Sequence, residues 1–238
     1  MLVYHMTFEA KSSEKEKAYT RLLDNILRGE ISANSQLSER GLSDYLGLGR
    51  TPVREAIKEL VREGVLESHP TRGTFLPQLS LTDIQEIYQV RYAIEGLAAF
   101  LAAERGPSEA LKGYKAAFEK VLNNPNFSDA SAVYDEGAEF HIEIFKTAGN
   151  ANLLKIYEPI RLRFRIALGM PRHHDPVRVF ESVREHLQIL EAIVNNEGEL
   201  AQKLICEHLH KGLQVRTRLF QATTGYTPNS ITSFTERQ

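Results

Sequence analysis

Four basic residues recur at a constant spacing of four: Arg50, Arg54, Lys58 and Arg62. On an α-helix, this spacing places the side chains in one row along a single face. Such a row suits the phosphate-lined major groove of DNA, and an arginine near the helix start can grip guanine O6 and N7 with two parallel hydrogen bonds, worth roughly 1–3 kcal/mol of discrimination. The spacing therefore indicates a helix that can read DNA.

An acidic row accompanies the basic one. Glu55, Glu59 and Glu63 lie one position round the same helix. The alternative interpretation is a solvated helix laced with ion pairs, because Glu and Arg three residues apart attract each other. We expect the acidic row to turn Lys58 and Arg62 towards pairing, which leaves base reading to the segment from Arg50 to Arg54.

The elements around this helix predict a winged helix-turn-helix. A helix is expected over 13–28, and a second one begins after the capping residue Ser38 and ends at Gly47. The third helix, with Pro52 in its first turn, runs to Gly64. The segments 65–69 and 73–77 are expected to be two short strands that form the wing.

Further DNA contacts follow from this arrangement. Thr51 and the amides at the start of the third helix can bind phosphate. Arg72 is expected at the wing tip, where it can enter the minor groove, and Gly73 lets the backbone approach closely.

Composition sets limits on the other functions. The 238 residues are 42% hydrophobic and 25% charged, and the formal net charge of −2 means that DNA binding must depend on where charge is placed. The single cysteine cannot form an internal disulfide, so we expect a cytoplasmic protein. No run approaches the ~20 apolar residues of a membrane span, and no membrane partner is expected.

The chain beyond the wing is expected to form an all-α bundle, so the fold class is mainly α. Helical periodicity predicts about six helices, over 82–105, 108–123, 129–148, 151–168, 176–195 and 198–223. The expected organisation is a flexible arm at 1–12, a winged domain at 13–77, a linker at 78–81, a helical domain at 82–225 and a loose tail at 226–238.

Three histidines stand mid-helix beside apolar residues: His141, His186 and His208. Antiparallel packing could bring them to one point, where neutral imidazoles would form a facial set for Zn²⁺ or a similar divalent ion. The alternative is three unrelated histidines that are each hydrogen-bonded, and the spacing alone leaves both possibilities open.

The first domain resembles the N-terminal domain of GntR-family bacterial transcription regulators. The matching segments are LSER at 37–40, RTPVREA at 50–56, Glu63-Gly64 and Arg72-Gly73. The resemblance implies operator contact by Arg40, Arg50, Thr51, Arg54, Arg72 and Gly73. Gly49 departs from the Ser or Thr that is common in the family, so a phosphate contact from that side chain is lost.

The second domain resembles the FCD ligand-binding domain of the FadR-like branch. The local matches are VRYAIE at 90–95, Phe140-His141, AGN at 148–150, EHL at 185–187 and EHL at 207–209. The resemblance implies a metal held by His141, His186 and His208, with zinc as the expected ion and nickel or manganese as alternatives. Where the family usually has a fourth ligand, an Asp, this chain has Gly137, which predicts either weaker metal binding or room for a carboxylate from the ligand.

The resemblance also implies a ligand-responsive regulator, with repression the usual outcome. We expect a homodimer that binds a pseudo-palindromic operator in double-stranded DNA and is controlled by a small anionic metabolite. Arg91, Tyr134 and Arg165 are the candidate effector contacts, although RLRFR at 161–165 could equally be an exposed basic stretch. Two alternatives remain: a metal-free regulator that responds to acyl-CoA, and a hydrolase that uses the three histidines to hold a metal.

Overall fold

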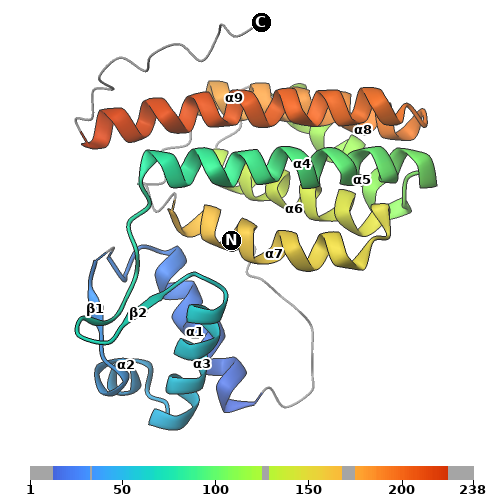
Figure 1. Cartoon of the computed structure of the whole chain (residues 1–238). Helices are drawn as coiled ribbons and strands as arrows, with labels where there is room; N and C mark the ends of the chain where they lie inside the picture. Colours follow the sequence, from blue (N-terminus) through green and yellow to red (C-terminus); the bar gives the residue numbers. More distant parts are fainter. Residues whose placement is uncertain (1–12, 33, 125–128, 168–174, 225–238) are drawn as a thin grey trace, which may run out of the picture.

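The N-terminal part of the chain forms a compact three-helix unit with a small sheet. The computed structural model describes residues 13–32, 34–124, 129–167 and 175–224. The unit contains α1 (Glu14–Leu27), α2 (Glu39–Leu46), α3 (Arg50–Arg62), β1 (Gln36–Leu37), β2 (Glu67–His69) and β3 (Gly73–Phe75). Figure 1 shows this unit below the remaining helices.

Local sequence explains where these helices begin and end. Ser13 accepts a hydrogen bond from the Glu16 amide, and the Glu16 carboxylate accepts one from the Ser13 amide, so a capping box starts α1. Ser38 caps α2 through the amide of Gly41. Gly47 ends α2 with a φ of +64°, a left-handed conformation that a residue without a Cβ adopts at little cost.

The sheet contains a strand that the sequence did not predict. Its order is β1-β3-β2, and both pairs are antiparallel. In β1, Gln36 lies opposite Phe75 and Leu37 opposite Thr74. The wing therefore consists of three strands in place of the two expected, and β1 joins the helix-turn-helix directly to the wing.

The rest of the described chain is helical, so the prediction of a winged helix-turn-helix followed by an all-α domain is confirmed. The helices are α4 (Leu81–Arg105), α5 (Glu109–Leu122), α6 (Ala130–Ala148), α7 (Ala151–Ala167), α8 (Pro176–Val194) and α9 (Gly198–Thr224). The long helices α4 and α9 pack along each other, and α8 lies against α5 and α9 (Figure 1). The expected arm and loose tail lie outside the described residues.

Helix α7 contacts both domains. Figure 1 places it on the side of the bundle nearest the winged unit. Leu162 packs against the apolar core of the winged unit, and Phe164 belongs to a separate cluster inside the bundle. The side chain of Arg163 lies against Gly64, which follows α3, so that a Cβ at Gly64 would come 3.3 Å from the Arg163 Cδ. Pro159 interrupts the hydrogen bonds of the same helix.

Three apolar clusters hold the fold together. One fills the winged unit and includes Ala18, Leu22, Val53, Ala56 and Leu60, each completely buried. The largest lies within the helical domain. Among the described residues, no helix is both long and apolar enough to cross a membrane.

Candidate functional site

The basic row of α3 divides as expected. Arg50 and Arg54, in the first half of the helix, are exposed, and Arg54 lies 3.8 Å from Glu55 without a hydrogen bond between them. Lys58 donates to Glu55 at 3.0 Å, and Arg62 donates to Glu59 at 2.7 Å.

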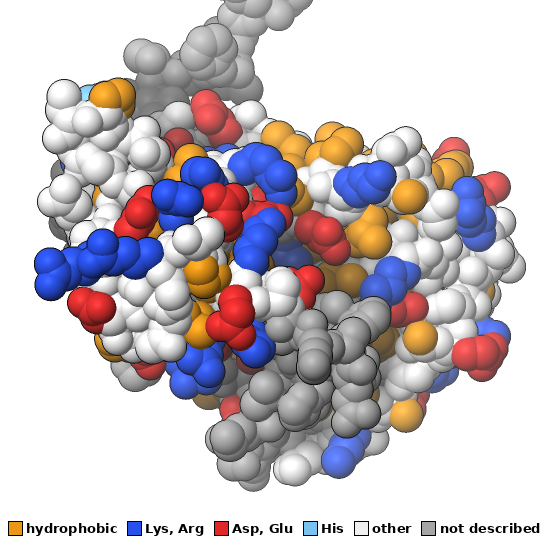
Figure 2. Space-filling view, turned by 90° about the horizontal axis from the view of Figure 1, so that it is seen from below, with side chains coloured by type: hydrophobic (Ala, Val, Ile, Leu, Met, Phe, Trp, Pro, Cys, Tyr) orange, Lys and Arg blue, Asp and Glu red, His pale blue; other side chains and the backbone are white. Residues whose placement is uncertain are grey.

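Glu63, in contrast, does not pair with a cation of the row. Its carboxylate accepts a hydrogen bond from the Tyr19 hydroxyl at 2.7 Å and so fixes the end of α3 to α1. Figure 2 shows basic and acidic side chains interspersed on the face of the molecule seen from below. The basic charge available to a groove is therefore concentrated at the start of α3.

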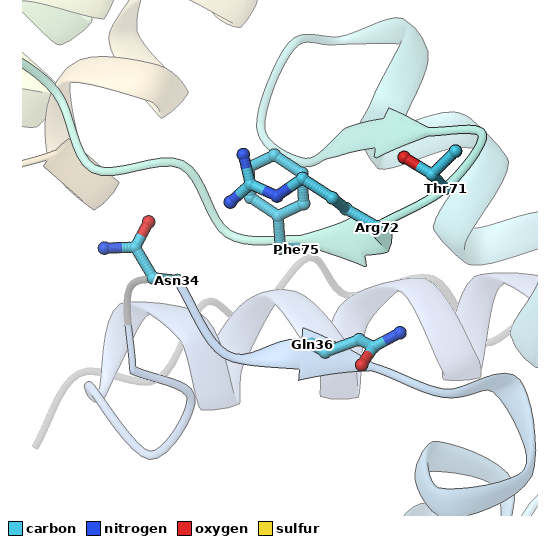
Figure 3. Close-up of a pocket in the computed structure, with 5 residues that line it drawn as sticks. All are labelled: Asn34, Gln36, Thr71, Arg72 and Phe75. Atoms are coloured by element: carbon cyan, nitrogen blue, oxygen red, sulfur yellow. The ribbon is translucent and has the colours of Figure 1, made fainter.

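The remaining predicted DNA contacts are exposed or lie in the wing. Arg40 and Thr51 are exposed, and Arg40 lies 3.9 Å from Asp44 on its own helix. Gly49 caps α3 without a side-chain hydrogen bond. Arg72 is exposed in the wing, and its guanidinium lies over the ring of Phe75, 4.8 Å from the centroid (Figure 3).

The structure brings the three predicted histidines together. His141 comes from α6, His186 from α8 and His208 from α9. The Nε2 atom of His186 lies 3.2 Å from Nε2 of His141 and 3.3 Å from Nε2 of His208. One ligand atom from each histidine falls within 4.8 Å of the other two. This histidine cluster can hold a metal ion on geometry alone.

Two carboxylates orient the outer histidines of this cluster. Glu95 lies 2.5 Å from Nδ1 of His141, and Glu185 lies 2.7 Å from Nδ1 of His208. Burial opposes ionisation of both acids, but neighbouring groups outweigh it and lower each pKa to about 2: Arg91 and His141 beside Glu95, and the hydrogen bonds of His208 and Arg178 to Glu185. An ionised carboxylate only accepts hydrogen bonds, so each Nδ1 donates, and in a neutral imidazole this leaves the lone pair on Nε2.

Burial favours the neutral form of His186 and of His208. Burial lowers the pKa of His208 to about 4, despite the favourable hydrogen bond to Glu185. Burial and the two neighbouring histidines also lower the pKa of His186 well below its ordinary value. Neutral imidazole is the form that binds a metal, so the donor set fits a divalent ion such as Zn²⁺.

Gly137 faces the third histidine. A Cβ at this position would lie 2.7 Å from Cε1 of His186 and 3.2 Å from its Nδ1. The space that was expected to admit a ligand carboxylate is therefore filled by the His186 ring. That Nδ1 atom is buried and has no hydrogen-bond partner among the described residues.

The neighbouring acids of α6 pair with arginines of α7. Glu139 accepts a hydrogen bond from Arg161 at 2.6 Å, and Asp135 lies 3.9 Å from Arg165. The carboxylates of the site come from other helices. Glu95 lies on α4 and Glu185 on α8.

The candidate effector residues occupy different environments. Arg91 is buried, donates to Glu95 at 2.5 Å and stacks over Phe164, so it supports the histidine cluster from behind. Tyr134 accepts a hydrogen bond from Arg216 at 2.9 Å. Arg165 is partly exposed and lies 3.9 Å from the carboxylate of Asp135.

Sequence reasoning missed Glu95, Glu185 and Arg216. The sequence did contain a sign that Glu95 could be buried and paired: Arg91 and Glu95 stand one turn apart in a strongly apolar helix. Arg216 has no such local signal. It is recognised only when α9 is placed beside Tyr134 of α6.

A winged helix-turn-helix joined to an all-helical domain is the architecture of a class of DNA-binding regulators. Residues 14–76 match the family described as bacterial regulatory proteins, gntR family, and residues 86–211 match the FCD domain. The chain therefore belongs to the GntR family of transcriptional regulators and carries a C-terminal FCD domain.

Individual relatives agree with this assignment. The chain is 28% identical over 184 residues to a "Probable D-xylose utilization operon transcriptional repressor" of Paenarthrobacter nicotinovorans, covering 77% of this chain and 80% of the relative. It is 23% identical over 191 residues to the regulator McbR of Escherichia coli, covering 79% and 85%. The solved structure of E. coli McbR/YncC superposes with a TM-score of 0.74 at 20% identity, covering 87% of this chain and 99% of that one, which shows a shared fold.

Proposed function

We propose that the protein is a homodimeric repressor whose affinity for a pseudo-palindromic operator is controlled by a small carboxylate-bearing metabolite. The metabolite binds in the helical domain beside a divalent metal, for which Zn²⁺ is the first candidate and Ni²⁺ or Mn²⁺ are alternatives. The repressor names of relatives support the sign of regulation. The two-fold dimer would match two operator half-sites to two winged units.

One observation carries the metal part of the proposal. Three Nε2 atoms converge, and carboxylates on the far side of two of the rings fix the tautomer that exposes the lone pairs. Three unrelated histidines would not need their lone pairs to face one another. His141, His186 and His208 would hold the metal, which would supply an electrophilic centre for an oxygen ligand.

The surroundings support an anionic ligand. Three histidines leave at least one coordination position for an oxygen donor. Arg216 lies two turns beyond His208 on α9, and Tyr134 lies two turns before His141 on α6. Their hydrogen bond places a guanidinium and a hydroxyl together, where a carboxylate could replace or extend the contact. Glu95 and Glu185 are engaged with the histidines, which favours an orienting role over that of a general base.

Metal content tests the centre directly. We expect protein purified without chelator to contain about one divalent ion per chain, because the three histidines form one site. The variant His186→Ala should lose that ion. The matched control is His210→Ala, which removes an exposed histidine of α9 that contacts Gln214. Equal metal content in the His186→Ala and His210→Ala proteins would contradict the proposed centre.

Operator selection tests the regulatory role. Sequencing the DNA that the purified protein retains from a random pool should reveal an inverted repeat, as a two-fold dimer requires. If no sequence is enriched, the regulator proposal fails. Adding candidate carboxylates to the metal-loaded protein and its operator then identifies the effector by the change in DNA affinity.

A further inference from the structure

The two carboxylates that orient the histidine cluster lie in different surroundings. Glu95, beside His141, is completely buried, and its partner Arg91 is buried as well. Glu185, beside His208, has a side chain that is 11% exposed. His208 is itself partly exposed, whereas the other two histidines of the cluster are buried. The cluster therefore has one support inside the bundle and one that reaches the solvent.

Two cations from two helices hold Glu185. Arg178, two turns earlier on α8, donates one hydrogen bond to each carboxylate oxygen, at 3.0 Å to Oε1 and 2.9 Å to Oε2. Lys211 of α9 lies 3.1 Å from Oε1. Paired bonds from a guanidinium fix the orientation of a carboxylate as well as its position. The direction in which Glu185 faces is therefore set by groups other than the histidine that it orients.

The two oxygens of Glu185 have different partners. Oε1 receives Arg178 and Lys211, whereas Oε2 receives Arg178 and, at 2.7 Å, Nδ1 of His208. His208 and Lys211 stand one turn apart on α9, so this helix contacts the same carboxylate at two points. The outer point is weak, because the Lys211 side chain is 56% exposed and an exposed ion pair contributes little.

We propose that His208 is the ligand that detaches first when the cluster releases its metal, and that Arg178 and Lys211 are positioning residues that control this step through Glu185. The inference rests on the proposed function, because it assumes that the three histidines hold a metal. His141 is fixed by a buried carboxylate, and His186 packs against two phenylalanine rings, so neither can turn away as readily. Loosening Glu185 frees the His208 ring to turn.

The rate of metal release measures how firmly His208 is held. Lys211→Met keeps an unbranched side chain but removes its charge. We expect Zn²⁺ transfer to an excess of chelating dye to become about 2–5-fold faster, because one exposed ion pair is lost. Arg178→Met removes two parallel hydrogen bonds and should weaken Zn²⁺ binding about 10–100-fold, as is typical when an outer partner of a metal-binding histidine is disturbed.

The matched control for release is Lys203→Met. It makes the same change on α9, where the lysine lies 3.9 Å from Glu207 in place of Glu185. Its release rate should equal that of the unmodified protein. Lys211 is exposed, so its replacement should leave the fold intact even if Arg178→Met does not fold. Equal release rates in Lys211→Met and Lys203→Met would overturn the inference.

The tautomer of His208 in the metal-free protein gives a second measurement. Glu185→Gln leaves one oxygen and one NH₂ group in place of two oxygens. Both cations converge on the Oε1 position, so we expect the amide oxygen to occupy it and the NH₂ group to face His208. Nδ1 of His208 must then accept a hydrogen bond, which moves the ring proton to Nε2 and removes the lone pair that binds metal.

Side-chain ¹⁵N chemical shifts should show this change for His208 and an unaltered tautomer for His141. Adding Lys211→Met to Glu185→Gln removes one of the charges that fix the amide, so part of His208 should return to the form protonated on Nδ1. A His208 that keeps its proton on Nδ1 in the single variant Glu185→Gln would also overturn the inference.

Failure of this inference differs from failure of the proposed function. If the unmodified protein holds Zn²⁺ but loses it at the same rate as Lys211→Met, the inference alone is wrong. If the unmodified protein binds no divalent metal, the metal centre of the proposed function is wrong and the inference is wrong with it.

Discussion

His186 is held differently from the other two histidines of the cluster. His141 and His208 each donate to a carboxylate, whereas the outer nitrogen of His186 faces Gly137. The His186 ring packs against the rings of Phe118 and Phe140, and this packing orients it in place of a hydrogen bond. A glycine at position 137 is a steric requirement of the cluster in its present arrangement.

A methyl group at position 137 tests this requirement. Gly137→Ala should destabilise the protein by about 1–3 kcal/mol, because the new Cβ would lie 2.7 Å from the His186 ring and force it to move. The same variant should bind metal more weakly. Urea unfolding and a competition assay with a chelating dye measure the two effects.

The control for this substitution lies on another helix. A Cβ at Gly113 of α5 meets no atom within 4 Å. Gly113→Ala should therefore stabilise the protein, by up to about 1 kcal/mol, since alanine is the better helix former. Two Gly-to-Ala changes that shift stability in the same direction would refute the steric argument.

How much of the site could be predicted depends on the distance between partners in the chain. The basic row of α3 was predictable, because its residues interact within one helix. The carboxylate partners of the histidines were not, because Glu95 and His141 are 46 positions apart and become neighbours only through packing. Helical periodicity indicates which face is buried, but it does not identify the opposing helix.

At the scale of elements, helices were predicted better than strands. Caps such as Ser13 and Gly47 are local signals, and the structure uses both. Strand β1 contains only two residues and pairs with residues almost forty positions later, so no local pattern marks it.

We expect the first half of helix α3 to read the DNA bases and the second half not to. Arg50→Ala and Arg54→Ala should each abolish preference for the operator, with a loss of roughly 1–3 kcal/mol per base contact. Lys58→Ala should leave the sequence preference unchanged, because Lys58 pairs with Glu55 and is not expected to contact a base. Repeating the operator selection with each variant distinguishes these outcomes. Unchanged sequence preference in either arginine variant would contradict the assignment.

At the scale of the whole molecule, α7 offers a physical connection between ligand and DNA. On one side, Phe164 supports Arg91, which binds Glu95 behind the histidine cluster. On the other, Leu162 packs against the core of the winged unit. A rearrangement at the histidine cluster that moves the end of α7 would therefore also change the position of α3.

Removing the contact of α7 with the winged unit should weaken this connection. We expect Zn²⁺ loading to change operator affinity in the unmodified protein, with a coupling of about 1–3 kcal/mol, and to change it less in Leu162→Ala. Leu154→Ala is the control, because Leu154 lies on the same helix but packs only against the bundle cluster. Operator titrations with and without Zn²⁺ give the coupling for each protein. Equal coupling in the two variants would exclude this route.

The position of Leu162 also has a consequence for folding. The winged unit completes its apolar core with a side chain supplied by the other domain, more than eighty residues after its own last strand. Melting of either domain would leave a gap or an exposed leucine in the other, so the two should not unfold as independent blocks. Heating should then give a shared, cooperative transition, and newly made chain should reach its most protease-resistant state only after α7 has been synthesised.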